Sequence, residues 1–285
     1  MPNATLAAMS QSAPLEALVQ SCVLKNTRPE AFSFPAETTL FDADDAPEND
    51  TLAELEAAVQ SGARRVVPFV SLEIAGRIQR QYPGLSRSLV FSPERLQFHS
   101  VSAIMGETML NQRHVLASWA SLPDRAADLA RAFGPTLFIR PNSATKSFTG
   151  FAVAAEQLRA EHGALSQTEH VPADELCVIA PAQSLPPIEW RFWVVDGRPI
   201  TCAPYRWDEP ATTPAETETT PPEELQNFAR AAASRTEVIE SALVLDVVMS
   251  ESGPRVVELN PLSTSGFYPG MDLKALLTAL ADIFV

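Results

Sequence analysis

The pattern of hydrophobic and polar positions in the first third of the chain alternates between helical and extended spacing. The predicted elements are a strand over 32–41 followed by an acidic loop at 42–45, a helix over 52–59 that ends near Gly62, a strand over 65–70 and a helix over 72–81. Such alternation is typical of α/β architecture. We therefore expect an N-terminal α/β lobe over residues 1–110.

The remainder of the chain mixes helices with antiparallel strands, which indicates an α/β (α+β) fold. The predicted elements are helices over 111–119 and 123–133, strands over 136–141 and 148–153, a helix over 154–162, a strand over 176–180, a hairpin over 188–206 with Asp196-Gly197 at its turn, a helix over 225–234, a hairpin over 242–261 and a closing helix capped by Asp272. We expect these elements to form a second domain over 111–285.

The hairpin over 242–261 carries the most specific chemical signal. Its loop, with Gly253 at the left-handed position, pairs the strands so that Asp246 lies opposite Glu258, with Asn260 on the same face. Two carboxylates placed opposite each other repel, and a set of oxygen ligands suits magnesium better than zinc. The alternative is a solvated acidic strand edge in which Asn260-Pro261 is an ordinary turn.

Two groups of cations accompany these acids. Arg140 ends a strand, and Lys146 and Ser147 follow in a polar loop over 142–147, where an anion such as a phosphate could be bound. Arg191 and Arg206 lie on the two strands of the 188–206 hairpin. The alternative for each cation is an ordinary surface ion pair or a solvated side chain.

Composition limits the classes of function. The chain has 285 residues, 46% of them hydrophobic, and a net charge of −14 with no basic patch, which argues against binding to nucleic acid or to an anionic membrane. The three cysteines are widely spaced, and no segment approaches the roughly 20 apolar residues of a membrane span. We expect a cytoplasmic protein without disulfides.

The order of these motifs resembles the ATP-grasp superfamily, specifically its clade named for an arginine and two lysines. More distantly, it is similar to eukaryotic cell-division-cycle factors that assemble translation initiation factor two. The resemblance covers about residues 136–285 and rests on Phe138-Ile-Arg-Pro, Lys146-Ser-Phe-Thr-Gly, Glu189-Trp-Arg-Phe, Tyr205-Arg206, Asp246 and Glu258-Leu-Asn-Pro. A counterpart of the clade's second lysine is missing. The resemblance implies two α/β lobes that clamp a nucleotide, preceded by a smaller N-terminal α/β lobe.

The resemblance also implies a role for each residue of the motifs. Asp246, Glu258 and Asn260 would hold Mg²⁺. Arg191 and Arg206 would contact the transferred phosphoryl group. The expected ATP-binding residues are Arg140, Lys146, Ser147, Arg191, Glu189 near the ribose or metal, and Val178, Ile179 and Ala180 at the adenine edge.

The implied activity is ATP-dependent ligation of a small-molecule or peptide carboxylate to an amine through an acyl phosphate. The alternative is an ATP-binding assembly factor with a protein partner and no ligase turnover. The roles of two segments each have two possible interpretations. The Pro/Thr/Glu tract at 208–223 is either a lid or a surface excursion, and the loop 263–266 either meets the acyl phosphate or only turns the chain.

Overall fold

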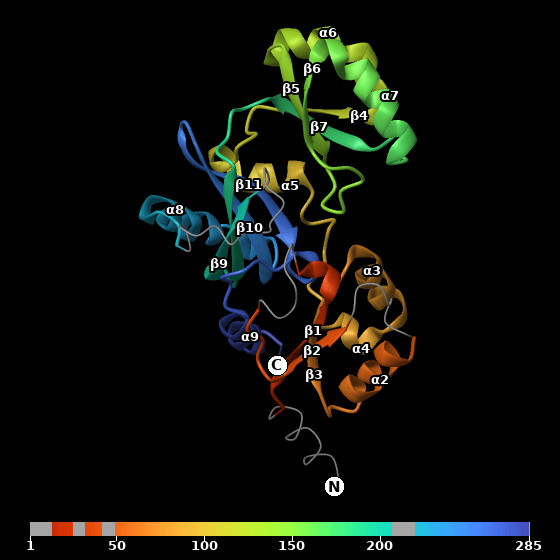
Figure 1. Ribbon diagram of the computed structural model, residues 1–285, viewed down its shortest axis with the longest axis vertical. Coiled ribbons are helices and arrows are strands. Elements are labelled where there is room, and N and C mark those ends of the chain that lie inside the picture. Colours follow the sequence, from red (N-terminus) through yellow and green to blue (C-terminus); the bar gives the residue numbers. More distant parts are fainter. Residues whose placement is uncertain (1–12, 25–31, 42–48, 207–219, 285) are drawn as a thin grey trace. The chain divides into compact units, whose positions relative to one another are not determined.

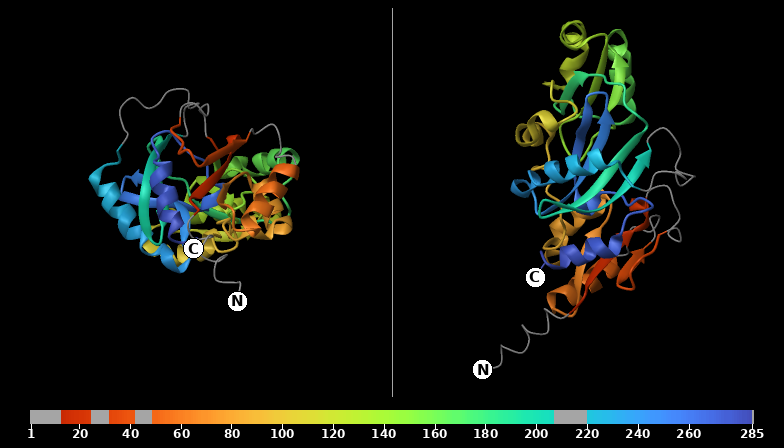
Figure 2. Two further views of the ribbon diagram at one scale, coloured as in Figure 1. Left: turned by 90° about the horizontal axis from the view of Figure 1, so that it is seen from below. Right: turned by 90° about the vertical axis from the view of Figure 1, so that its left-hand side faces the viewer.

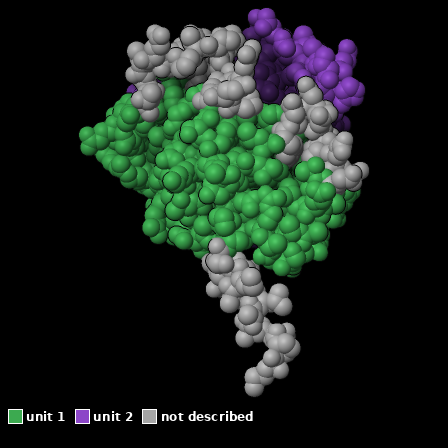
Figure 3. All heavy atoms as spheres, turned by 60° about the horizontal axis from the view of Figure 1, so that its bottom comes forward, with its two compact units in different colours: residues 1–92, 187–247, 260–285 green, residues 93–186, 248–259 purple. Residues whose placement is uncertain are grey.

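The computed structural model describes residues 13–24, 32–41, 49–206 and 220–284 (Figure 1). The chain divides into two compact units, coloured separately in Figure 3. Unit 1 comprises Met1–Ser92, Pro187–Val247 and Asn260–Val285, and unit 2 comprises Pro93–Pro186 and Val248–Leu259. These compact units are not necessarily domains. The expected domain boundary near residue 110 therefore stays a prediction.

Unit 1 begins with a parallel sheet of order β2-β1-β3. Its helices α2 and α3 are those expected from the helical spacing, whereas α4 was not predicted. Helix α3 is capped by Ser71, whose hydroxyl accepts a hydrogen bond from the Ile74 amide at 3.3 Å. The elements are β1 (Leu15–Gln20), β2 (Thr38–Phe41), α2 (Asn49–Gln60), β3 (Arg65–Phe69), α3 (Leu72–Gln81) and α4 (Pro83–Ser86). The predicted α/β character of this region is confirmed.

One side chain of this sheet fastens both ends of the described chain. Arg65 donates to the Ala13 carbonyl at 3.2 Å and to the Ala281 carbonyl at 2.9 Å. The last helix, α9 (Leu273–Ala281), packs against β1 and is capped as expected, with Asp272 accepting from the Ala275 amide at 2.9 Å (Figure 2).

A second sheet has the order β11-β10-β8-β9. The turn between its strands β8 and β9 has positive φ at Asp196 (45°) and Gly197 (66°), which is the type I′ geometry that an Asp-Gly pair favours. Gly253 likewise has the expected positive φ, 98°. The elements are β8 (Ile188–Val195), β9 (Arg198–Arg206), α8 (Glu223–Ala233), β10 (Ala242–Ser250) and β11 (Gly253–Pro261).

Unit 2 contains an antiparallel sheet of order β4-β7-β5-β6 with α6 and α7 packed on one face (Figure 1). Trp119, 1% exposed, lies in the core beneath these helices. The elements are α5 (Phe98–Met105), β4 (Val115–Ser118), α6 (Leu122–Phe133), β5 (Thr136–Pro141), β6 (Phe151–Ala154), α7 (Leu158–Thr168) and β7 (Leu176–Pro181).

Several predicted elements differ from the structure. The helix expected over 111–119 is wrong, because this segment forms strand β4 and then a 3₁₀ turn at Trp119–Ser121. The strand expected over 32–41 begins only at Thr38. The acidic loop at 42–45 and residues 208–219 of the polar tract lie outside the described residues. Within the described ranges, no helix has both the length and the apolar character needed to cross a membrane.

Candidate nucleotide and metal site

The predicted acid Asp246 forms a buried ion pair in unit 1. Arg191 on β8 donates from Nε to Oδ1 at 2.8 Å and from Nη2 to Oδ2 at 2.6 Å. Asp246 is 2% exposed and Arg191 is 8% exposed, so the bidentate pair is largely removed from water. The Asn260 side-chain amide also donates to Asp246 Oδ2, at 3.1 Å, and the Tyr268 ring lies 5.1 Å from the Arg191 guanidinium carbon. Asp246, Asn260 and Arg191 therefore form one cluster.

The other predicted acid, Glu258, is held by two cations in unit 2. Arg140 at the end of β5 donates to Glu258 Oε2, and Lys146 donates to Oε1, each at 2.6 Å. The guanidinium of Arg140 also lies 5.4 Å from the ring centre of Phe98, a cation–π contact. The structure thus brings together the two cations expected to bind phosphate and one of the acids expected to bind metal.

These contacts change the argument for a metal. Repulsion between Asp246 and Glu258 indicated that a divalent cation was needed, but each carboxylate already has its own counter-charge. Among the described residues, no group of three or more His, Cys, Asp or Glu side chains forms a metal site. The donor set of two carboxylates and one amide nevertheless fits a hard cation such as Mg²⁺ in its chemistry. The register that places Asp246 opposite Glu258 stays a prediction.

The polar loop after β5 is held in an unusual backbone conformation. Lys146 has φ of 52°, in the left-handed region that side chains other than glycine rarely adopt. Within the loop, the Ser143 hydroxyl accepts a hydrogen bond from the Thr145 amide at 3.2 Å. The Ser147 hydroxyl is buried, and no hydrogen-bond partner for it is found in the described part of the chain. A buried hydroxyl without a partner can donate a hydrogen bond to a bound anion.

Gly150 is a residue of this site that the sequence reasoning did not single out. A methyl group added at its Cα would lie 2.9 Å from Phe138 Cζ and 3.1 Å from Arg140 Cβ. Glycine therefore allows the start of β6 to pass close beside Arg140. The only signal in the sequence was the glycine of the Phe148-Thr-Gly motif.

The three residues expected at the adenine edge lie in the interior of a sheet. Val178, Ile179 and Ala180 are all 0% exposed, on a strand paired on both sides. The Ala182 amide donates to the Thr136 carbonyl, and alternate residues of an antiparallel strand face the same neighbour, so Val178 and Ala180 face β5 while Ile179 faces β4. Their backbone groups are therefore used by the sheet, and the predicted adenine contact does not fit these three residues.

The remaining predicted residues are placed by the β8–β9 hairpin. Glu189 pairs with Tyr205 in register, and Arg206 pairs with Ile188. Glu189 therefore lies two residues before Arg191 on the same face of β8, as expected. The side chain of Arg206 lies outside the described part of the structure, and its role stays a prediction.

Acids and an amide on the β10–β11 hairpin, with cations from β8, from β5 and from the loop after β5, agree with the ATP-grasp class of nucleotide-binding folds. Over residues 87–280 the sequence matches the model of an ATP-grasp domain family, the third family of the clade named for an arginine and two lysines, and the chain belongs to this family. A search of curated proteins finds no match. The predicted superfamily and the α/β fold class are confirmed.

Solved structures of ATP-grasp ligases are similar to this chain. D-cycloserine synthetase DcsG has a TM-score of 0.54 at 13% identity, with 95% of this chain and 100% of that chain covered. The D-alanine-D-alanine ligase from Coxiella burnetii has 0.55 at 14%, with 96% and 95% covered. ATP-grasp ligase PsnB, complexed with a phosphomimetic variant of a minimal precursor, Mg and ADP, has 0.50 at 14%, with 96% and 99% covered. At these identities the likeness establishes the fold, which is that of an ATP-grasp ligase.

Proposed function

We propose that this chain is an ATP- and magnesium-dependent ligase that joins a carboxylate to an amine through an acyl phosphate. The observation that carries the proposal is the pairing of each predicted metal-binding acid with a predicted phosphate-binding cation. Glu258 is paired with Arg140 and Lys146, and Asp246 with Arg191. The three free thiols fit the reducing cytoplasm, where ATP is available.

Nucleotide binding would exchange these ion pairs for others. Asp246, Glu258 and Asn260 would hold Mg²⁺, which would offset the negative charge of the phosphates. The acids tether the cations in place before the nucleotide arrives. Arg140 and Lys146 would then turn from Glu258 to phosphate oxygens, and the Ser147 hydroxyl would donate to the same anion. PsnB, which shares the fold, is a ligase whose structure contains both Mg and ADP.

The chemical step needs no nucleophile from the protein. A substrate carboxylate oxygen would attack the γ-phosphorus and ADP would leave, after which the amine would attack the acyl carbon, phosphate would leave, and the amine would lose a proton. Arg191 and Arg206 would stabilise charge on the transferred phosphoryl group. Burial raises the pKa of the Cys177 thiol to about 12, which agrees with a mechanism that uses no thiolate.

The adenine contact would come from Pro181, the last residue of β7, which pairs with β5 but lies beyond the pairing with β4. The Pro181 carbonyl faces the same side as Ile179, but β4 begins at Val115, which is already opposite Ile179. Strand β4 therefore offers Pro181 no partner, and its carbonyl can accept from the adenine amino group. Glu189 would lie near the ribose or the metal.

Ligase turnover is tested by incubating the protein with Mg²⁺, ATP and paired panels of amino acids and short peptides, and by measuring ADP and phosphate. Release that requires both a carboxylate and an amine supports the proposal. An ¹⁸O-labelled carboxylate should transfer one label to the released phosphate if an acyl phosphate forms. Tight ATP binding without turnover on any pair would instead favour the assembly-factor alternative.

Variants of the site make this test specific. Lys146→Ala should weaken binding of a non-hydrolysable ATP analogue by about 1–3 kcal/mol, because it removes a charge-assisted contact. Lys274→Ala, which removes an exposed lysine from α9, is the matched control and should bind normally. Glu258→Gln should remove the dependence of affinity on Mg²⁺. Equal Mg²⁺ dependence in this variant and the parent would contradict the metal assignment.

A further inference from the structure

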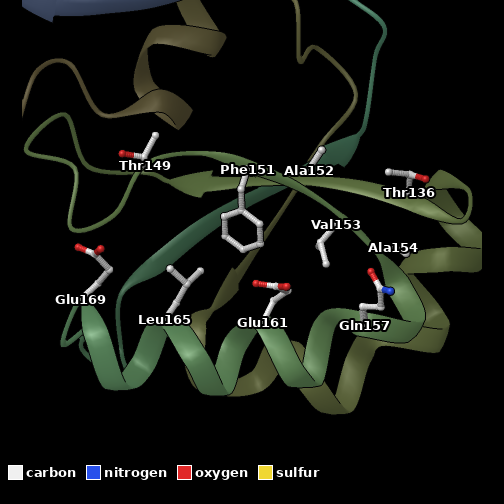
Figure 4. Close-up of a pocket in the computed structure, with 10 residues that line it drawn as sticks. All are labelled: Thr136, Thr149, Phe151, Ala152, Val153, Ala154, Gln157, Glu161, Leu165 and Glu169. Atoms are coloured by element: carbon white, nitrogen blue, oxygen red, sulfur yellow. The ribbon is translucent and has the colours of Figure 1, made fainter. Parts of the chain in front are cut away.

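A groove of about 480 Å³ lies between strand β6 and helix α7 of unit 2 (Figure 4). In this view Phe151 and Val153 extend from the strand, and Glu161 and Leu165 extend from the helix toward the same space. Residues Gln157, Glu161, Leu165 and Glu169 recur at every fourth position, so they form one stripe along α7 and the residues that cap its two ends. The proposed reaction does not use this groove.

The strand that borders the groove has an open edge. β6 is the terminal strand of its sheet and pairs only with β5 among the described strands. The Ala155 amide donates to the Pro135 carbonyl, so residues of the same parity, Phe151 and Val153, turn their backbone groups toward β5. Ala152 and Ala154 therefore turn their N–H and C=O groups outward. These groups can pair with an added strand.

The groove has an apolar floor and acidic walls. Phe151 pairs with Ile139, and Val153 with Leu137, so both side chains share the helix-covered face of the sheet. Glu161 and Glu169 are exposed, and neither forms an ion pair within the part of the chain that the structure describes. Glu169 also follows the last residue of α7, where the helix dipole disfavours a carboxylate. A cation at this position would be stabilised by the Glu169 carboxylate and by the helix dipole.

We propose that this groove binds an extended basic peptide segment of another protein, which adds to the sheet as a fifth strand beside β6. Glu161 and Glu169 are eight residues apart on the helix, or about 12 Å at 1.5 Å per residue. Side chains on one face of a strand repeat at about 6.7 Å, so basic residues at positions i and i+4, about 13 Å apart, match the two acids. An apolar residue at i+2 would then cover Phe151 and Leu165.

Charge excludes a second copy of this chain as the occupant. Pairing two β6 edges would bring two copies of Glu161 and Glu169 together, and the whole chain already has a net charge of −14. A basic segment is attracted to the same surface. The main-chain pairing would supply affinity that does not depend on sequence, and the alternate side chains would supply specificity.

The groove lies on a different face of the sheet from the predicted phosphate-binding arginine. Phe151 and Val153 share the face of Ile139 and Leu137, whereas Arg140 is the next residue of β5 and so points to the opposite face. The peptide site is therefore independent of the proposed nucleotide site. Its test does not require ATP.

The test measures binding of a labelled peptide, Ser-Lys-Thr-Val-Thr-Lys-Ser, to the full chain by fluorescence anisotropy at concentrations up to about 1 mM, where binding is still worth roughly 4 kcal/mol. Saturable binding that weakens with added salt is expected. The permuted peptide Ser-Thr-Lys-Val-Lys-Thr-Ser, which puts its valine and lysines on opposite faces, should bind more weakly. Absence of binding, or equal binding of the two peptides, would overturn the proposal.

Variants locate the bound peptide. Glu161→Gln and Glu169→Gln should each weaken binding about two- to fivefold, as expected for exposed ion pairs. Glu156→Gln, which removes an exposed acid outside the groove, is the matched control. Ala152→Pro removes one outward N–H at a position where an edge strand tolerates proline, and should weaken binding while Ala152→Ser does not.

Three further measurements keep the outcome decisive. Melting curves should show that each variant keeps the parental fold. Amide NMR shifts on titration should centre on Ala152 and Ala154, and shifts confined to another surface would refute the site. Sedimentation that shows a dimer abolished by Ala152→Pro would mean that a second copy occupies the edge, which also contradicts the proposal.

Discussion

The Arg191–Asp246 ion pair makes a quantitative prediction about stability. Arg191→Met would leave the Asp246 carboxylate, 2% exposed, with only the Asn260 amide as a hydrogen-bond donor among its described contacts. Asp246→Leu would conversely leave the Arg191 guanidinium without its bidentate acceptor. Breaking a buried ion pair by removing one partner typically costs about 3–5 kcal/mol, because an uncompensated charge stays buried.

The double variant Arg191→Met/Asp246→Leu should lose less unfolding free energy than the two single variants lose together. Replacing both charges with apolar side chains of similar size is often nearly neutral, since no buried charge is left behind. For a folding unit of this size, about 1 kcal/mol shifts the melting temperature by roughly 2–4 °C. Each single variant should therefore melt about 6–20 °C below the parent, and the double variant should recover most of that loss.

The assay is thermal unfolding followed by circular dichroism on all four proteins, without nucleotide. Arg230→Met, which removes an exposed arginine from α8, is the control and should change stability by less than about 0.5 kcal/mol. If the losses of the single variants simply add in the double variant, the two side chains are not energetically coupled, and the reasoning from the bidentate geometry is refuted.

Three further changes test other contacts. Gly150→Ala should lower nucleotide affinity severalfold in a calorimetric titration, because the new methyl group lies 3.1 Å from Arg140 Cβ; unchanged affinity would show that Arg140 need not stay in place. Glu56→Ala should lower the free energy of unfolding by about 2–4 kcal/mol, since the Gly84 amide donates to this carboxylate at 2.7 Å and a second amide is also left unpaired; a loss below the error of denaturant melts would contradict this. The folded pKa of Cys177 is raised from 9.0 to about 12, so its contribution to stability should fall as pH rises through that window, and Cys177→Ala should flatten the decline measured between pH 9 and 12; an equal slope in both proteins would count against the shift.

Local signals in the sequence were sufficient for the hairpins. The Asp196-Gly197 pair allows positive φ at both turn positions, and Gly253 does the same for the second hairpin, so both turns follow from residue type alone. The cap at Asp272 was likewise a local property. These features depend on contacts only a few residues apart.

Elements without such a signal were missed or mistaken. β1 (Leu15–Gln20) is a parallel strand with strands on both sides, so it lacks the alternation that marks an exposed strand. β4 (Val115–Ser118) is too short to be told from a helical turn by spacing alone, and its pairing with β7 decides its conformation.

The partners of the site residues were also beyond the sequence. Arg191 and Asp246 are 55 residues apart, on the neighbouring strands β8 and β10, and Arg140 and Glu258 are 118 apart, on strands of two different sheets. Their pairing therefore depends on the tertiary fold. The sequence named these acids and cations as candidates, but it did not show which acid pairs with which cation. The metal role of the acids stays a prediction.

The contacts of Arg65 with Ala13 and Ala281 have a consequence for synthesis on the ribosome. Strand β1 emerges well before α9, which packs against it, and the Arg65–Ala281 contact spans 216 residues. Such distant contacts close slowly and only after α9 has been synthesised. The face of the first sheet that α9 covers therefore stays exposed until then, and chaperones that recognise exposed apolar strands have this face as their target.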